Sequence, residues 1–136
     1  MIVIDTNILA YGILAQSDPT KRAQVEKLLA REQVLVPVLW RHEFLNLLAS
    51  YAKAGMVTLP VAEGYWRQAV ATMQDAEGEV DFVRALEIAA QLNISGYDAE
   101  FLALAEGANT VLVTEDQKLR KAAPALALSL KEYLAG

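Results

Sequence analysis

Short, uniformly apolar runs separated by long helical patterns constrain the fold of this chain most. The clearest runs are Ile2–Ile4, Val34–Val36 and Thr110–Val113, and Leu126–Leu128 is a weaker one. A strand without polar alternation is buried on both faces, as in a parallel sheet that helices cover. Strands that alternate with helices form parallel units with right-handed crossovers. The sequence therefore predicts a three-layer α/β fold, with a parallel sheet of about four to five strands and helices on both faces.

The segments between the apolar runs carry helical spacing and helix-capping residues. Asp18-Pro19 is typical of a helix start, and Gly55 and Gly107 are typical of helix ends. Helices are predicted over residues 6 onward, 19–31, 39–54, 58–73, 80–92 and 97–106, with short ones around Leu119 and from Lys131. The polar stretch Gln74–Glu79 is predicted to be a flexible loop. A chain of 136 residues suits one domain, so residues 1–136 are expected to form a single unit.

The residue types that are missing limit the chemistry. The chain has no cysteine and one histidine, His42, which excludes thiolate and multi-histidine metal sites as well as cysteine nucleophiles. Any metal ion would need oxygen ligands. The start of the chain has no signal-peptide pattern, and no apolar run is long enough to cross a membrane, so we expect a cytoplasmic protein.

Two aspartates follow predicted strands directly. Asp5 comes after Ile2–Ile4, and Asp116 comes shortly after Val113. Sites in parallel sheets form beyond the carboxyl ends of strands, which favours a functional role. Each aspartate could instead be the N-cap of the helix that follows it.

Two further acids share a helix face with apolar residues. Glu43 stacks with Trp40 and Leu47, and Asp98 lies on the same face as Phe101. Burial of an isolated carboxylate costs several kcal/mol, so each acid needs a partner or a cation. The alternatives are a glutamate at the margin of the apolar stripe or paired with an arginine, and an aspartate in the first turn of its helix.

Taken together, these four acids indicate a metal site at one end of the sheet. Two carboxylates about 5 Å apart repel by about 3 kcal/mol at an effective dielectric of 20, and no basic residue is obviously placed among them. Magnesium or manganese fits these oxygen ligands. The net charge of −5 argues against a polyanionic partner, but without the four acids 13 acidic residues face 12 basic ones.

Four segments in this order resemble the PIN-domain ribonucleases, and within them the VapC-type toxins of toxin–antitoxin pairs. They are Asp5-Thr6-Asn7 after the first strand, Glu43 in the helix after the second strand, Tyr97-Asp98-Ala99 at a helix start, and Val113-Thr114-Glu115-Asp116 after the third strand. Each segment alone is weakly specific, whereas their order and spacing are fairly specific.

The resemblance implies a PIN-like three-layer fold and magnesium- or manganese-dependent hydrolysis of RNA phosphodiester bonds. It implies that Asp5, Glu43, Asp98 and Asp116 are the catalytic, metal-holding acids, supported by Asn7 and Thr114. It also implies a homodimer and a cognate antitoxin that covers or enters the acidic cleft. Candidate substrate-binding residues are Arg41 beside Glu43, together with Lys118 and Arg120 beyond Asp116.

Two other classes of function stay open from the sequence. Asp5 could be the nucleophile of an aspartyl-phosphate phosphatase or the phosphoacceptor of a receiver domain. The phosphatases usually carry a second aspartate where this chain has Asn7, and the lysine of receiver domains is not in its expected place. The chain could also be a non-catalytic protein- or RNA-binding module whose acids only cap helices.

Overall fold

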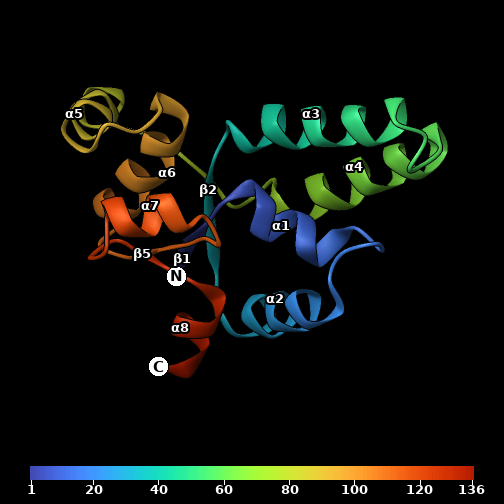
Figure 1. Ribbon diagram of the computed structural model, residues 1–136, viewed down its shortest axis with the longest axis horizontal. Helices are drawn as coiled ribbons and strands as arrows, with labels where there is room; N and C mark the ends of the chain where they lie inside the picture. Colours follow the sequence, from blue (N-terminus) through green and yellow to red (C-terminus); the bar gives the residue numbers. More distant parts are fainter.

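A parallel five-stranded sheet forms the centre of the molecule, with strand order β3-β2-β1-β4-β5 (Figure 1). The computed structural model describes all residues 1–136. The strands are β1 (Ile2–Ile4), β2 (Val34–Pro37), β3 (Glu77–Gly78), β4 (Leu112–Val113) and β5 (Ala127–Leu128). The predicted α/β class and strand number are confirmed.

Eight helices connect and cover the strands. They are α1 (Thr6–Ile13), α2 (Pro19–Arg31), α3 (Trp40–Lys53), α4 (Leu59–Met73), α5 (Phe82–Leu92), α6 (Gly96–Gly107), α7 (Gln117–Ala122) and α8 (Leu130–Ala135). The caps explain several boundaries, since Asp18 accepts hydrogen bonds from Thr20 N and Lys21 N at the start of α2. None of the helices has the length and apolar character that crossing a membrane requires.

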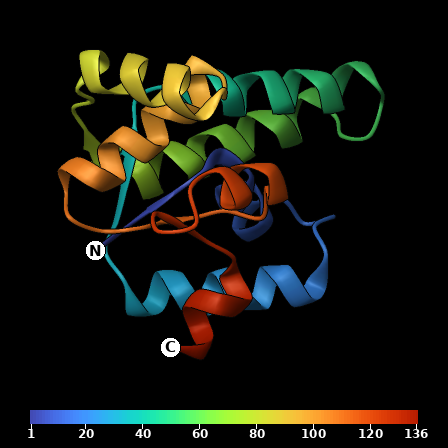
Figure 2. The ribbon, with the colours of Figure 1, turned by 60° about the vertical axis from the view of Figure 1, so that its left-hand side comes forward.

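Two hydrophobic cores lie on opposite faces of the sheet. Side chains alternate along β1, so Ile2 and Ile4 join one core and Val3 joins the other. The first core includes side chains of α1 to α4 and α8, and the second includes those of α5, α6 and α7. Figure 2 shows α8 lying along α2, away from α5 and α6. This arrangement is the predicted three-layer fold.

The segment Gln74–Glu79 was predicted to be a flexible loop, and this prediction is wrong at residues 77 and 78. Its residues Glu77 and Gly78 form edge strand β3, which pairs in parallel with β2. A Cβ atom at position 78 would lie 2.9 Å from a methyl carbon of Leu35, so glycine permits this close packing. The Glu77 carboxylate also accepts hydrogen bonds from the indole of buried Trp40 and from Arg41. Tertiary contacts therefore hold this polar segment in place.

Helix α5 forms as predicted, but most of its large apolar residues face solvent. Phe82, Val83 and Leu86 are 67%, 70% and 70% exposed, whereas the smaller Ala85 and the branched Ile88 are buried against α6. The buried stripe of α5 is thus narrow, and a second apolar stripe stays uncovered in the single chain.

The order of the strands places a crevice beside β1. The chain runs outward from β1 to β2 and β3 and then returns to add β4 and β5 on the other side of β1. The direction of winding reverses between β1 and β4, and ligands of open α/β sheets bind outside the carboxyl ends of strands at such a point. Asp5 and Thr114 directly follow these two strands.

Candidate active site

The four predicted acids line one cavity of about 400 Å³ at the carboxyl ends of β1 and β4. Helices α1, α3, α6 and α7 contribute the remaining walls. The lining residues are Asp5, Thr6, Asn7, Glu43, Asn46, Leu47, Ser50, Asp98, Phe101, Asp116 and Leu119. Residues from four distant parts of the chain therefore meet here, although this does not by itself assign them a role.

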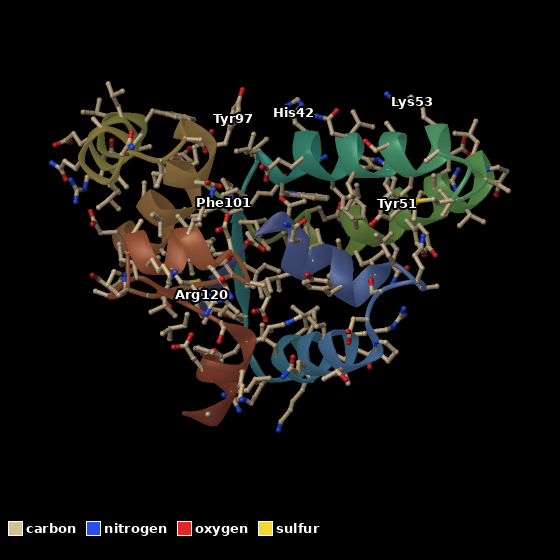
Figure 3. The ribbon with its side chains drawn as sticks, viewed as in Figure 1. His42, Tyr51, Lys53, Tyr97, Phe101 and Arg120 are labelled. Carbon is tan, nitrogen blue, oxygen red and sulfur yellow. The ribbon has the colours of Figure 1, made fainter.

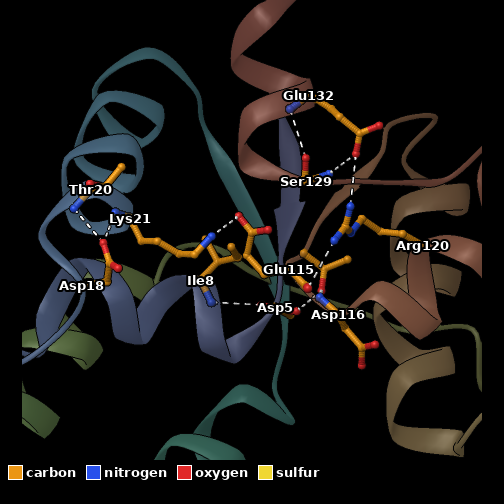
Figure 4. A network of polar contacts seen from close by, with 11 residues as sticks. Asp5, Ile8, Asp18, Thr20, Lys21, Glu115, Asp116, Arg120, Ser129 and Glu132 are labelled. Atoms are coloured by element: carbon orange, nitrogen blue, oxygen red, sulfur yellow. Dashed lines mark hydrogen bonds and ion pairs between the residues drawn. The ribbon is translucent and has the colours of Figure 1, made fainter.

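Asp5 is held by two hydrogen bonds and also caps a helix. One carboxylate oxygen accepts from Ile8 N at 3.0 Å, which caps α1, and the other accepts from the hydroxyl of Thr114 (Figure 4). Thr114 is fully buried, and its Oγ1 accepts in turn from Asp116 N at 3.1 Å. Asp116 caps α7 through Leu119 N. Thr114 thus links the acids that follow β1 and β4.

Glu43 and Asp98 enter the cavity from the two helices that flank it. The hydroxyl of Thr6, which is 7% exposed, donates to Glu43 Oε1 at 2.6 Å. The amide of Asp98 donates to the Ser95 hydroxyl that caps α6. A hydrogen bond from the Ser95 side chain lowers the pKa of Asp98 and so opposes the larger effect of burial, and no basic side chain pairs with this carboxylate.

No basic side chain forms an ion pair with any of the four acids. Burial raises the pKa of Asp5 to about 6, and the charges of Glu43 and Asp116 add to this effect. Burial also raises the pKa of Glu43, and repulsion from Asp98 adds to this rise. Burial likewise raises the pKa of Asp98, and repulsion from Asp116 adds to it. Burial raises the pKa of a fifth acid, Glu100 on α6, and repulsion from Glu43 contributes. The acids therefore repel one another in a partly dry site.

The raised pKa of Asp5 predicts a pH-dependent loss of stability in a metal-free buffer. A carboxyl whose pKa is higher in the folded protein destabilises the fold as pH rises from about 4 to about 6, and the loss persists above that range. The loss amounts to at most about 3 kcal/mol at 1.36 kcal/mol per pKa unit. We expect Asp5→Asn, which preserves the helix cap, to reduce this decline to the part that comes from Glu43, Asp98 and Glu100. Urea unfolding in a chelator at pH 4 and pH 7 measures the free energy of unfolding of the unmodified protein and of the variant. An equal change with pH in these two proteins would contradict the prediction.

The oxygen-rich lining fits a hard divalent cation. Carboxylate, hydroxyl and amide oxygens are the ligands that magnesium and manganese prefer, and the acids have no other source of positive charge. In the present side-chain arrangement, no three acidic or histidine side chains lie close enough to ligate one common ion. The chemistry of the donors therefore supports a metal site, whereas a preformed cage of three ligands is not present.

The three candidate substrate-binding cations lie outside the cavity lining. Arg41 forms a bidentate ion pair with Glu77, at 2.6 and 2.8 Å. Arg120 lies beside Glu132 at 3.4 Å and donates to the carbonyl of Glu115 (Figure 4). Lys118 is exposed on α7. The ion pair with Glu77 gives Arg41 a structural role that the sequence analysis did not predict.

Several cavity residues were missed by the sequence analysis. Asn46 and Ser50 lie on α3 at three and seven residues from Glu43, so helical spacing could have revealed them. Thr6 could have been found from its place beside Asp5.

The model of the PIN domain matches residues 2–124 of the chain. The chain belongs to the PIN-domain family. It is 34% identical over 122 residues to the VapC ribonuclease Mb0985 of Mycobacterium bovis, with 88% of each chain covered. Ribonuclease VapC9 of Mycobacterium tuberculosis matches with the same identity and coverage. Within the PIN-domain family, the chain is therefore of the VapC type.

Two solved structures share this fold. The structure of PAE2754 from Pyrobaculum aerophilum superposes with a TM-score of 0.77 at 22% identity, covering 98% of this chain and 93% of the other. The structure of FitAcB from Neisseria gonorrhoeae gives a TM-score of 0.68 at 16% identity, covering 96% and 99%. At such low identity these likenesses support the PIN fold alone.

Proposed function

We propose that this protein is a magnesium- or manganese-dependent endoribonuclease that hydrolyses RNA phosphodiester bonds, with residues 1–136 acting as one domain. The observation that carries the proposal is the gathering of Asp5, Glu43, Asp98 and Asp116 around one cavity without a basic partner. The VapC ribonucleases to which the chain is similar support RNA as the substrate.

The side chains of the cavity would hold the cation and orient the reactants. When bound, the divalent cation supplies a more acidic water and positive charge at the phosphate. The four carboxylates are its proposed ligands, directly or through water. Thr114 and Thr6 fix the carboxylates of Asp5 and Glu43 by donating hydrogen bonds, and Asn7 offers an exposed amide at the cavity wall. A carboxylate of the cavity that is not bound directly to the cation, such as Glu43, would accept the proton of the attacking water.

The rival functions fit the geometry less well. The aspartyl-phosphate alternative lacks two of its usual partners, because Asn7 stands where the second aspartate of these phosphatases is expected and no lysine lines the cavity. A module whose acids only stabilise helix starts can account for each acid separately, since Asp5 and Asp116 cap helices and Glu43 and Asp98 lie in the first turns of theirs. It gives no reason for all four acids to line one cavity. The nuclease proposal accounts for all four positions.

We also propose that the protein is the toxin of a type II toxin–antitoxin pair and acts in the cytoplasm as a homodimer. An antitoxin that covers the cavity would contribute basic side chains to neutralise its acids. A largely apolar groove of about 350 Å³ between α3 and α4 offers a neighbouring surface for the antitoxin. The exposed apolar stripe of Phe82, Val83 and Leu86 on α5 offers a surface for the second copy.

The proposal is tested by incubating the purified protein with single-stranded RNA in magnesium, manganese or a chelator. We expect internal cleavage with either metal and none with the chelator. Attack by water leaves no 2′,3′-cyclic phosphate, so the products should lack this end group. Cleavage that persists in the chelator, or that produces cyclic phosphate ends, would contradict the proposed reaction.

A further inference from the structure

A second cavity of about 340 Å³ continues from the acidic cavity along α1 and α3. Asn7 and Leu47 line both cavities and form the boundary between them. One helical turn beyond them, at four residues' spacing, Tyr11 and Tyr51 line the second cavity. Tyr51 lies eight residues from Glu43 on α3, or about 12 Å along the helix axis. The two cavities therefore form one groove with acids at one end and tyrosines at the other.

The hydroxyl groups of the two tyrosines are available to a ligand. Both rings are half-buried and pack on the core, but neither hydroxyl forms a hydrogen bond with the protein. Tyr65 differs, because its hydroxyl accepts from Ala15 N and donates to Gln16. The ammonium of Lys21 lies 6.0 Å from the centre of the Tyr11 ring, which restrains that ring from one side. Figure 3 labels Tyr51 below α3 on the right of the view and Phe101 on the left, beside α6.

The composition of the second cavity favours a nucleobase over a phosphate. No basic side chain lines it, and its one acid, Asp18, already caps α2. The nearby ammonium of Lys21 lies outside the lining and is paired with Glu115 at 3.2 Å, so a phosphate there would meet no free positive charge. An uncharged base, in contrast, can stack on an aromatic ring and form hydrogen bonds with amides and hydroxyls, which is how proteins read single-stranded RNA.

We propose that Tyr11 and Tyr51 form a subsite for one nucleobase of the RNA, next to the scissile phosphate. The base stacks on an exposed part of these rings, and the amides of Asn7 and Gln16 lie within the same cavity wall to contact its edge. The subsite rests on the proposed nuclease function and adds a source of sequence preference to it. Neither tyrosine hydroxyl is a buried atom without a partner, so both are open to solvent and accessible to a ligand beside the acidic cavity.

Cleavage of a random-sequence RNA, followed by sequencing of the new ends, tests the proposal. We expect a base preference at one position beside the cut. Tyr51→Leu and Tyr11→Leu should each weaken this preference. Each variant should also raise KM about tenfold and leave kcat within about twofold of the unmodified value. Tyr51→Phe retains the ring and should retain most of the preference. Tyr133→Leu is the matched control, because Tyr133 is half-buried beneath Arg31 but lines neither cavity. An unchanged preference and KM in both leucine variants would overturn the subsite.

A binding measurement separates the subsite from catalysis. Protein with carbon-13-labelled tyrosine rings is titrated with a short single-stranded 2′-O-methyl RNA in a chelator, and the ring resonances are assigned by the same variants. We expect the signals of Tyr11 and Tyr51 to shift and those of Tyr133 to stay. Shifts without cleavage in the magnesium assay would support the subsite and refute the nuclease. Cleavage of natural RNA without such shifts, and with an unaltered base preference in the tyrosine variants, would support the nuclease and refute the subsite.

Discussion

Replacing Asp98 by asparagine is expected to lower metal-dependent RNA cleavage by about 100- to 1000-fold or more. Asp98 lines the cavity and no basic side chain neutralises its carboxylate, so its charge is available for a cation. Asparagine has almost the same shape but lacks this charge, and losing one electrostatic contact in an active site commonly costs this much. Asp5→Asn is expected to have an effect of the same size. Single-turnover rates in magnesium measure both.

Asp81→Asn is the matched control for these variants. Asp81 caps α5 by accepting from Arg84 N at 3.1 Å, as Asp5 caps α1, but it does not line the acidic cavity. We expect this variant to cleave RNA at the normal rate. Unfolding curves for all three variants show whether the fold persists. Normal cleavage by both Asp5→Asn and Asp98→Asn would refute the assignment of the site.

Adding magnesium or manganese is expected to raise the melting temperature by about 8 °C when the metal concentration is about 100 times its dissociation constant. A ligand that binds only the folded protein stabilises it by about 2.7 kcal/mol under this condition. For a chain of this size, 1 kcal/mol corresponds to about 3 °C. The physical cause is relief of repulsion among the four acids. Differential scanning fluorimetry against metal concentration measures the shift.

The acid variants reveal where the metal acts. Asp5→Asn and Asp98→Asn should start from an equal or higher melting temperature in the chelator, because one repelling charge is gone, and should gain less from metal. Asp81→Asn should respond like the unmodified protein. An equal metal response in all of these proteins would mean that the stabilising ion binds elsewhere.

Most of the fold was predictable because its signals are local. Apolar runs marked β1, β2 and β4, and capping residues such as Asp18 and Thr58 marked helix starts. The capping and cluster interpretations of Asp5 both describe its geometry, since one of its oxygens caps α1 and its carboxylate lines the cavity. The residues next to Asp5 in the sequence could not show both roles together, because its hydrogen-bond partner Thr114 lies 109 residues away.

The features that were predicted wrongly or missed are ones that tertiary contacts create. Strand β3 consists of a glutamate and a glycine, which have no intrinsic preference for a strand, and pairing with β2 creates it. Arg41 is adjacent to Glu43 in sequence, but its ion pair with Glu77 links α3 to that edge strand. The exposed face of α5 follows from which side of the helix packs on α6, which its apolar residues alone did not reveal.

Residues distant in sequence are proposed to create one site for a divalent cation, and an anomalous-scattering map from manganese-soaked crystals would locate that cation. We expect a peak inside the acidic cavity, with carboxylate oxygens of at least two of Asp5, Glu43, Asp98 and Asp116 at coordination distance. A map with manganese bound only elsewhere, and with these four carboxylates turned away from one another, would contradict it.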